Sequence, residues 1–247
     1  MSLPLHVVPS LEGVAVGAVV RVEGDEAHHA VAVRRLRVGE QVLLTDGRGS
    51  RLRGEVDSVA KRLVEVRVLE VEAPAAPPEP ALVVVQALPK GDRGELAVEV
   101  LTEVGVARVV PWAAERSVAV WKGERAERSL ARWRSTAREA AKQSRRRWHP
   151  EVDPLARTAD VVALVAGADL AVVLHEAASR TLAGLDVPAH GTYVVVVGPE
   201  GGLSEAEVAA LAQAGAHPVR LGEEVLRTST AGLAACSALL ARTARWR

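Results

Sequence analysis

Residues 192–208 read TYVVVVGPEGGLSEAEV, an apolar β-branched run that breaks into a glycine-rich loop and then restarts as a helix. A run without polar alternation is typical of a strand buried on both faces, as in a parallel sheet. Gly201 and Gly202 would let a ligand approach the main chain closely. Ser204, followed by Glu207 three positions later, predicts a capping box at a helix start with unpaired amides. The stretch suits a polar, flat or anionic ligand, although an ordinary strand-to-helix turn explains the loop equally well.

A second stretch of the same kind favours a binding site. Residues 217–230, HPVRLGEEVLRTST, predict a strand, a loop at Gly222, and Thr228 or Ser229 as the cap of a helix over 230–242. Two strand-loop-helix units place their loops at the same edge of a parallel sheet, which is where ligands of α/β proteins bind.

Upstream residues extend this sheet. The sequence predicts a strand over 81–87, a helix over 92–104 closed by Gly105, and a strand over 107–110, which together form a β-α-β unit. A further buried strand over 169–176 ends in His175 and Glu176. The fold class is therefore α/β with a mostly parallel sheet.

The first part of the chain has a different pattern. Short strands and turns run from residue 3 to 71, and residues 64–71 alternate strictly between apolar and polar, so we expect a small β-barrel. Residues 73–80, APAAPPEP, hold four prolines in eight positions and predict a stiff linker. The expected domains are thus 1–72 and 81–247. Four glycines are expected to mark turns of the barrel: Gly39, Gly47, Gly49 and Gly54.

Positive charge is concentrated in one helix. The chain has 31 Lys and Arg against 31 Asp and Glu, yet residues 125–147 hold nine basic residues against two Glu, a local net charge of +7. Apolar residues at helical spacing define the buried stripe, so the arginines should point outward. They are Leu130, Trp133, Ala137 and Ala141, and we expect Trp133 and Trp148 to anchor the core. We favour a polyanionic partner such as a nucleic acid over a merely solvated face.

Several classes of protein are unsupported. The single cysteine, Cys236, allows no internal disulfide, and the seven histidines lack metal-ligand spacing. No dinucleotide, phosphate-loop or Gly-x-Ser-x-Gly motif is present. No apolar run reaches membrane-spanning length. We therefore expect a cytoplasmic protein without a metal or a membrane partner.

Five segments together resemble one enzyme family. They are ALPKGDRGE, AERSV, REAAKQSRR, VVGPEGGLSEAEV and LGEEVLRTSTAGLAA, and they resemble bacterial methyltransferases of the SPOUT superfamily that modify N3 of a uridine in 16S ribosomal RNA. HHAVAVRRLRVGE is similar to the PUA-like RNA-binding barrel of that family. The resemblance implies a trefoil-knot fold for 81–247, S-adenosylmethionine as methyl donor, a homodimer, and 16S ribosomal RNA or the 30S subunit as partner.

The resemblance also implies the site residues. Arg227 would stabilise the uracil anion or hold a phosphate, and Glu200 would take the N3 proton or pair with the donor's charge. The cofactor would be bound by Leu174, His175, Glu176, Val197, Gly198, Pro199, Glu200, Gly201, Gly202, Leu203, Leu221, Gly222, Val225, Leu226, Arg227 and Thr228. RNA would be bound by His28, His29, Arg34, Arg35, Lys90, Arg93, Arg116, Arg138, Lys142, Gln143, Arg145 and Arg146. For the histidines and arginines at 28–37, a solvated surface is an equally good interpretation.

The sequence departs from the family pattern at two places. Ser229 stands where the family usually has Glu, and Glu223-Glu224 stand where Pro-Arg is common, so no general base is assigned. Two other functions stay open: a superfamily enzyme that acts on transfer RNA or a ribose hydroxyl, and an RNA-binding assembly factor without catalysis. The barrel disfavours the first, and the intact glycine loops disfavour the second.

Overall fold

The computed structural model describes residues 3–246, and the chain divides into two compact units. Unit 1 comprises residues 1–77 and 142–149, and unit 2 comprises residues 78–141 and 150–247. The outermost positions of the two expected domains, 1–2 and 247, lie outside the described residues.

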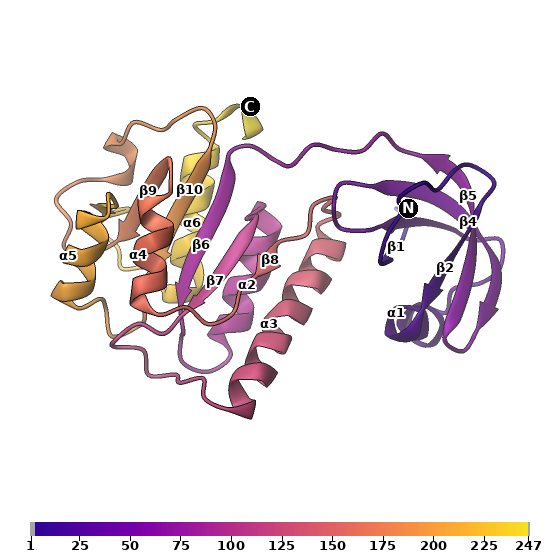
Figure 1. The fold of residues 1–247 in the computed structure, drawn as a ribbon, viewed down its shortest axis with the longest axis horizontal. Coiled ribbons are helices and arrows are strands. Elements are labelled where there is room, and N and C mark those ends of the chain that lie inside the picture. The colour runs from indigo at the N-terminus through magenta and orange to yellow at the C-terminus, as the bar shows by residue number, and fades with distance from the viewer. Residues whose placement is uncertain (1–2, 247) are drawn as a thin grey trace. The chain divides into compact units, whose positions relative to one another are not determined.

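Unit 1 is built on a five-stranded sheet with the order β1-β3-β4-β5-β2 (Figure 1). Its strands are β1 (Leu5–Val7), β2 (Val19–Glu23), β3 (Gln41–Thr45), β4 (Arg51–Ala60) and β5 (Leu63–Val71). In β5, Val64, Val66 and Val68 are buried while their neighbours are more exposed, as the alternation predicts. These valines form one core with Val22 and Leu44.

Two expectations for unit 1 are wrong. Residues near His28, expected as strand, are helical: α1 (Gly24–His28) runs into a π-helical turn, η1 (His29–Val33). The buried residues of this segment are Ala27 and Ala30, three positions apart, which fits a helix rather than a strand. Gly54, expected in a turn, lies inside β4 at a bulge. A Cβ at Gly54 would come within 2.7 Å of the Arg67 carbonyl oxygen, so the close approach of β5 requires glycine.

Unit 2 contains a six-stranded sheet whose order is β11-β9-β10-β6-β7-β8. The strands are β6 (Ala81–Ala87), β7 (Arg108–Trp112), β8 (Glu151–Val152), β9 (Leu170–Leu174), β10 (Thr192–Val197) and β11 (His217–Val219). Every pairing between them is parallel, which confirms the expected α/β class. The carboxyl ends of β6, β9, β10 and β11 consequently meet at one edge.

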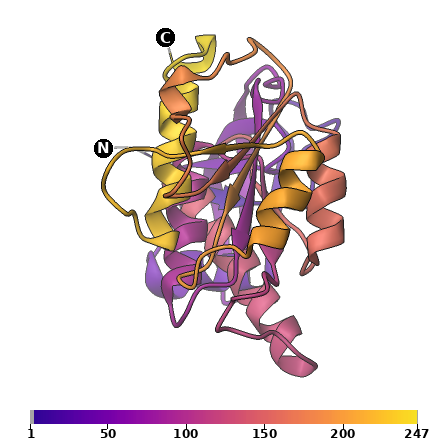
Figure 2. The same cartoon turned by 90° about the vertical axis from the view of Figure 1, so that its left-hand side faces the viewer.

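Helices cover both faces of this sheet (Figure 2). The helices are α2 (Arg93–Val104), α3 (Glu124–Gln143), α4 (Thr158–Ala166), α5 (Glu205–Gln213) and α6 (Thr228–Leu240), with short turns η2 (Leu182–Gly184) and η3 (Ala244–Trp246). One core cluster joins the sheet to α2, α3 and α6 and includes Leu101, Trp133 and Cys236, as expected for the tryptophan. A second cluster joins the other face to α4 and α5 through Val161 and Leu211.

Two expected boundaries and one expected burial need correction. Helix α6 begins at Thr228, two residues earlier than expected, so its N-cap is Arg227 rather than Thr228 or Ser229. Strand β9 ends at Leu174, so His175 and Glu176 lie in the following loop. Trp148, expected in the core, is half-buried in unit 1, where its indole donates to the Ala75 carbonyl oxygen at 2.9 Å. No helix within 3–246 has the length and apolar character needed to cross a bilayer.

Candidate functional site

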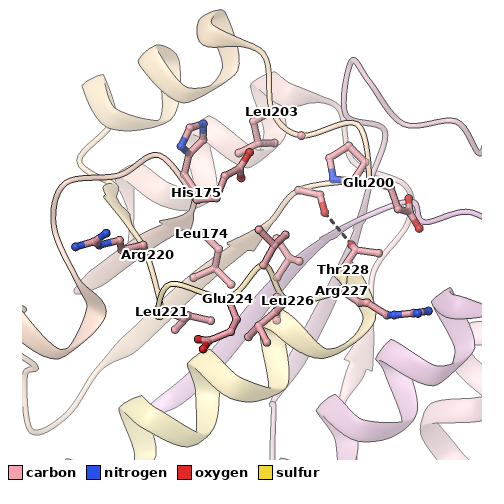
Figure 3. Close-up of a pocket in the computed structure, with 18 of the residues that line it drawn as sticks. Leu174, His175, Glu200, Leu203, Arg220, Leu221, Glu224, Leu226, Arg227 and Thr228 are labelled. Carbon is pink, nitrogen blue, oxygen red and sulfur yellow. Dashed lines mark hydrogen bonds between the residues drawn. The ribbon is translucent and has the colours of Figure 1, made fainter.

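Unit 2 has a cavity of about 330 Å³ at the carboxyl edge of β9, β10 and β11 (Figure 3). Its walls are the loop after β9, the glycine-rich loop after β10, the segment between β11 and α6, and the first turn of α6. Cavities of this size hold small organic ligands, and this edge is the usual binding position in α/β folds.

Almost all residues that the sequence predicted for the cofactor line this cavity. They are Leu174, His175, Glu176, Val197, Gly198, Pro199, Glu200, Gly202, Leu203, Leu221, Gly222, Val225, Leu226, Arg227 and Thr228. Gly201 is not among the lining residues. A Cβ there would lie 3.0 Å from the Arg116 carbonyl oxygen, so Gly201 is packed against the loop that carries Arg116.

The cavity also has walls that the sequence prediction missed. Val219, Arg220, Glu223, Glu224 and Ala231 line it, and so does Arg93, which was predicted to contact RNA. Val219 and Arg220 could have been predicted from the position of β11, because the end of this strand faces the cavity. Arg93 could not have been placed from the sequence, because its contact partner, Glu200, is 107 residues away.

Apolar side chains from three loops surround the space. Leu174, Leu221 and Leu226 lie close together in Figure 3, and Leu203 adds a further wall. Val225 is 79% exposed and Leu226 is 40% exposed, so the third loop presents apolar surface to a ligand or a partner. Gly202 has a φ of +71°, a conformation that favours glycine, so the second loop requires this residue. These walls suit the faces of a flat ring.

The start of α5 forms the predicted capping box. The Ser204 hydroxyl accepts from the Glu207 amide at 3.2 Å, and the Glu207 carboxylate accepts from the Ser204 amide at 3.0 Å. These two amides are therefore already bonded, contrary to the expectation that this helix start presents unpaired amides. Glu207 is 4% exposed, and its other oxygen accepts from the Glu115 amide at 2.8 Å. The capping box thus also fixes the loop around Glu115 beside the second loop.

Glu200 connects two loops at the edge of the cavity. Its carboxylate accepts from the Lys90 amide at 3.2 Å and from the Arg93 guanidinium at 3.2 Å. Its side chain is 28% exposed. Because N–H donors already engage both oxygens, the arrangement suits a clamp between the β6–α2 loop and the β10–α5 loop.

Arg227 and Thr228 are neighbours with different environments. The Arg227 carbonyl accepts from the amides of Thr230 and Ala231, whereas its guanidinium makes no hydrogen bond to any residue within 3–246. In Figure 3 this guanidinium extends away from the leucines of the cavity. Thr228 is 7% exposed, and its hydroxyl donates to the Gly198 carbonyl oxygen at 2.8 Å while it accepts from Gln86 at 3.1 Å. Gln86 was missed, although a lone amide side chain in the apolar strand β6 was a usable signal.

Of the cations predicted for RNA, most are accessible but one is not. Lys90, Arg116, Arg138, His28, Arg34, Arg35, Arg145 and the amide side chain of Gln143 are exposed, whereas Arg93, His29 and Arg146 are half-buried. Lys142, also predicted for RNA, is 9% exposed and lies 2.9 Å from the Glu26 carboxylate.

Lys142 belongs to a buried charge cluster in unit 1. The Glu26 carboxylate also lies 3.1 Å from His6 Nδ1, and the His6 ring is 3% exposed. Burial raises the pKa of Glu26, but hydrogen bonds from His6 and Lys142 and the charge of Lys142 outweigh it and lower that pKa to about 2. The cluster joins β1, α1 and residue 142 of the same unit.

Comparisons with known proteins match both parts of the chain. The model of an RNA methyltransferase domain matches residues 77–240, and that of an RNA methyltransferase PUA domain matches residues 22–69. Ribosomal RNA small subunit methyltransferase E of Mycobacterium bovis is 45% identical over 93% of this chain and 89% of its own length. The protein of the same name from Bacillus subtilis is 32% identical, with 90% of each chain covered.

Two solved structures are similar over nearly the whole chain. A methyltransferase from Legionella pneumophila with bound SAM has a TM-score of 0.90 at 27% identity, covering 98% of this chain and 99% of its own. Ribosomal RNA small subunit methyltransferase E from Neisseria gonorrhoeae, bound to S-adenosyl methionine, has a TM-score of 0.87 at 27% identity, covering 98% of each chain.

Proposed function

The chain belongs to the RNA methyltransferase family whose domain spans residues 77–240, and from that premise we propose that it methylates N3 of a uracil in 16S ribosomal RNA. The observation that carries the proposal is the cavity between the three loops, which lies on a chain that matches ribosomal RNA small subunit methyltransferases E over about nine-tenths of its length. The methyl donor is S-adenosylmethionine, which two similar structures hold.

The lining residues fit this cofactor. Leu174, Leu221 and Leu226 offer apolar surface for the faces of adenine, and the open glycine loop offers main-chain groups for its polar edge. Glu223 and Glu224 also line the cavity, and their charge favours a cationic ligand. When bound, the cofactor supplies a methyl group on a positively charged sulfur that leaves as a neutral thioether.

The protein residues align the acceptor and stabilise its charge. Uracil N3 must lose a weakly acidic proton, and the unpaired guanidinium of Arg227 at the cavity rim is suited to stabilise the resulting anion. We assign Glu200 the positioning of the β6–α2 loop through Lys90 and Arg93. Ser229 is 3% exposed, so the position that departs from the family pattern does not supply a general base.

Exposed side chains of the protein are suited to contact RNA and a second subunit. We assign RNA contact to exposed cations without an ion pair among residues 3–246, such as Arg34, Arg35 and Arg138, since free guanidinium groups favour phosphate. A homodimer would cover the apolar side chains of Val225 and Leu226 at the cavity rim. Light scattering of the purified protein tests whether it is a dimer. We infer a cytoplasmic location, which is where a bacterial ribosomal RNA substrate would be found.

One experiment tests the activity. The protein is incubated with labelled S-adenosylmethionine and either naked 16S RNA, 30S subunits or transfer RNA, and the product is digested to nucleosides for mass spectrometry. We expect N3-methyluridine from 16S RNA or from the subunit. Ribose methylation, or transfer RNA as the preferred acceptor, would replace the proposed substrate. Absence of cofactor binding in calorimetry would support an assembly factor instead.

A further inference from the structure

Gln86 is a polar residue in an otherwise apolar strand. It lies at the carboxyl end of β6, between Val85 and Ala87, and it is 1% exposed. In the sheet it pairs with Val197 of β10 and with Pro111 of β7. A buried amide is unfavourable unless it is hydrogen-bonded, so its bonds indicate why this position is not another valine.

The Gln86 side chain starts a directional chain of hydrogen bonds. Its Nε2 donates to the Ala87 carbonyl oxygen at 3.2 Å and to Thr228 Oγ1 at 3.1 Å. Thr228 Oγ1 has one proton, and it donates that proton to the Gly198 carbonyl oxygen at 2.8 Å. The chain therefore joins the end of β6, the first turn of α6 and the first residue of the glycine-rich loop.

Both residues that Gln86 connects belong to the cavity wall, whereas Gln86 itself does not line it. Gly198 opens the second loop and Thr228 follows the third loop, and the two are 30 residues apart. The chain of bonds sets the distance between these loops before a ligand enters. Loops held in this way lose less conformational entropy on binding.

The side-chain oxygen of Gln86 shows that this residue does not serve the stability of the core. Gln86 Oε1 is buried and has no hydrogen-bond partner among residues 3–246. An unsatisfied acceptor destabilises the fold, so Gln86 is not explained as a stabilising core residue. The hydrogen bond from its Nε2 to Thr228 explains why a polar residue is present at this buried position.

We propose that Gln86 is a positioning residue for the cofactor, which acts through Thr228 and Gly198 to hold the two loops of the cavity in register. The proposal rests on the proposed use of S-adenosylmethionine. It assigns a role in the binding of the methyl donor to a residue of β6 that does not line the cavity.

Calorimetric titration of the full chain with S-adenosylmethionine tests this role. In Gln86→Leu, which keeps the volume but loses the donor, we expect cofactor affinity to fall about tenfold. The melting temperature without cofactor should stay unchanged or rise, because the unsatisfied oxygen is removed as well. A stabilising core role predicts the opposite pattern, in which the melting temperature falls and the affinity stays unchanged, and that result would overturn the proposal.

Substitutions at Thr228 provide an independent test, which also serves if Gln86→Leu does not fold. Thr228→Val removes the hydroxyl and should weaken cofactor binding about tenfold, whereas Thr228→Ser keeps it and should restore the affinity. Thr102→Val is the matched control, because Thr102 is a buried threonine whose hydroxyl bonds the Val98 carbonyl oxygen inside α2. Equal affinity of Thr228→Val and Thr228→Ser would refute the relay. If the unaltered protein binds no S-adenosylmethionine, the proposed function itself fails instead.

Discussion

At the scale of single residues, two cations of α3 show what a sequence pattern can and cannot predict. Arg138 and Lys142 are one helical turn apart, and both were predicted to contact RNA. Arg138 is exposed, whereas Lys142 is buried against Glu26, which is 116 positions away. Local periodicity predicts which face of a helix is buried, but it contains no information about a distant carboxylate that can pair with a cation at the edge of that face.

Arg227 is the residue for which the structure gives the sharpest catalytic prediction. We expect Arg227→Ala to lower kcat/KM for methyl transfer about 100-fold or more, because it removes the charge assigned to the uracil anion. Folding should persist, since only the main chain of Arg227 takes part in capping α6. Arg157→Ala is the matched control, because Arg157 is the exposed N-cap residue of α4. Full activity of Arg227→Ala would remove this residue from the mechanism.

At the scale of elements, strands in unit 2 were more predictable than helix starts. Strand β6 matches its predicted range, and β10 forms from the apolar run at the start of residues 192–208, because an unbroken apolar run leaves few alternatives for a buried parallel strand. The start of α6 was misplaced because Thr228 resembles a cap in sequence. In the structure its hydroxyl bonds Gly198 and Gln86 instead of a helix amide. Hydrogen bonds to distant residues therefore decide whether Thr228 is the N-cap or the first residue of α6.

The capping box of α5 gives a prediction about stability. Ser204→Ala should destabilise the protein by about 1 kcal/mol, because the Glu207 amide loses its acceptor. Ser204→Thr keeps the hydroxyl at the same position and should recover most of this loss. Chemical denaturation of the three proteins, followed by circular dichroism, measures the difference. A Ser204→Ala protein with unaltered stability would show that the cap does not contribute.

The Glu26 cluster predicts how the stability of unit 1 depends on pH. The pKa of Glu26 is about 2 in the fold, below its usual value of 4.5, so the carboxylate stabilises the folded state fully above about pH 4.5. That contribution, about 3 kcal/mol, is lost as the pH falls toward 2. We expect Glu26→Gln to lose less stability than the unaltered protein between pH 7 and pH 3 in denaturant titrations. Glu70→Gln, an exposed partner of Arg53, should behave like the unaltered protein, and an equal loss in Glu26→Gln would contradict the prediction.

At the scale of the whole molecule, the convergence of loops was predictable but the connections between them were not. Parallel strands must end at the same edge, so the two glycine-bearing segments were expected to meet there, whereas the individual residues of the cavity wall came from the family resemblance. The links across the wall join residues more than 100 positions apart, as Glu200 with Arg93 and Gln86 with Thr228 do. Such pairs depend on the order of strands in the sheet, which no local pattern specifies.

Whether a cationic side chain is free or paired with a carboxylate predicts how the protein binds RNA. The chain is neutral as a whole, so affinity for RNA depends on cations that no carboxylate neutralises. Arg138 is exposed on α3 and has no bonded carboxylate among residues 3–246, whereas Arg53 donates to Glu70 at 2.9 Å. We expect Arg138→Gln to weaken 16S RNA binding and to reduce the slope of log affinity against log salt by about 0.7 to 0.9, which corresponds to one phosphate contact. Arg53→Gln should change the slope much less. Filter binding across a series of salt concentrations measures both slopes, and equal slopes for the two variants would show that pairing within the fold does not select the cations that contact RNA.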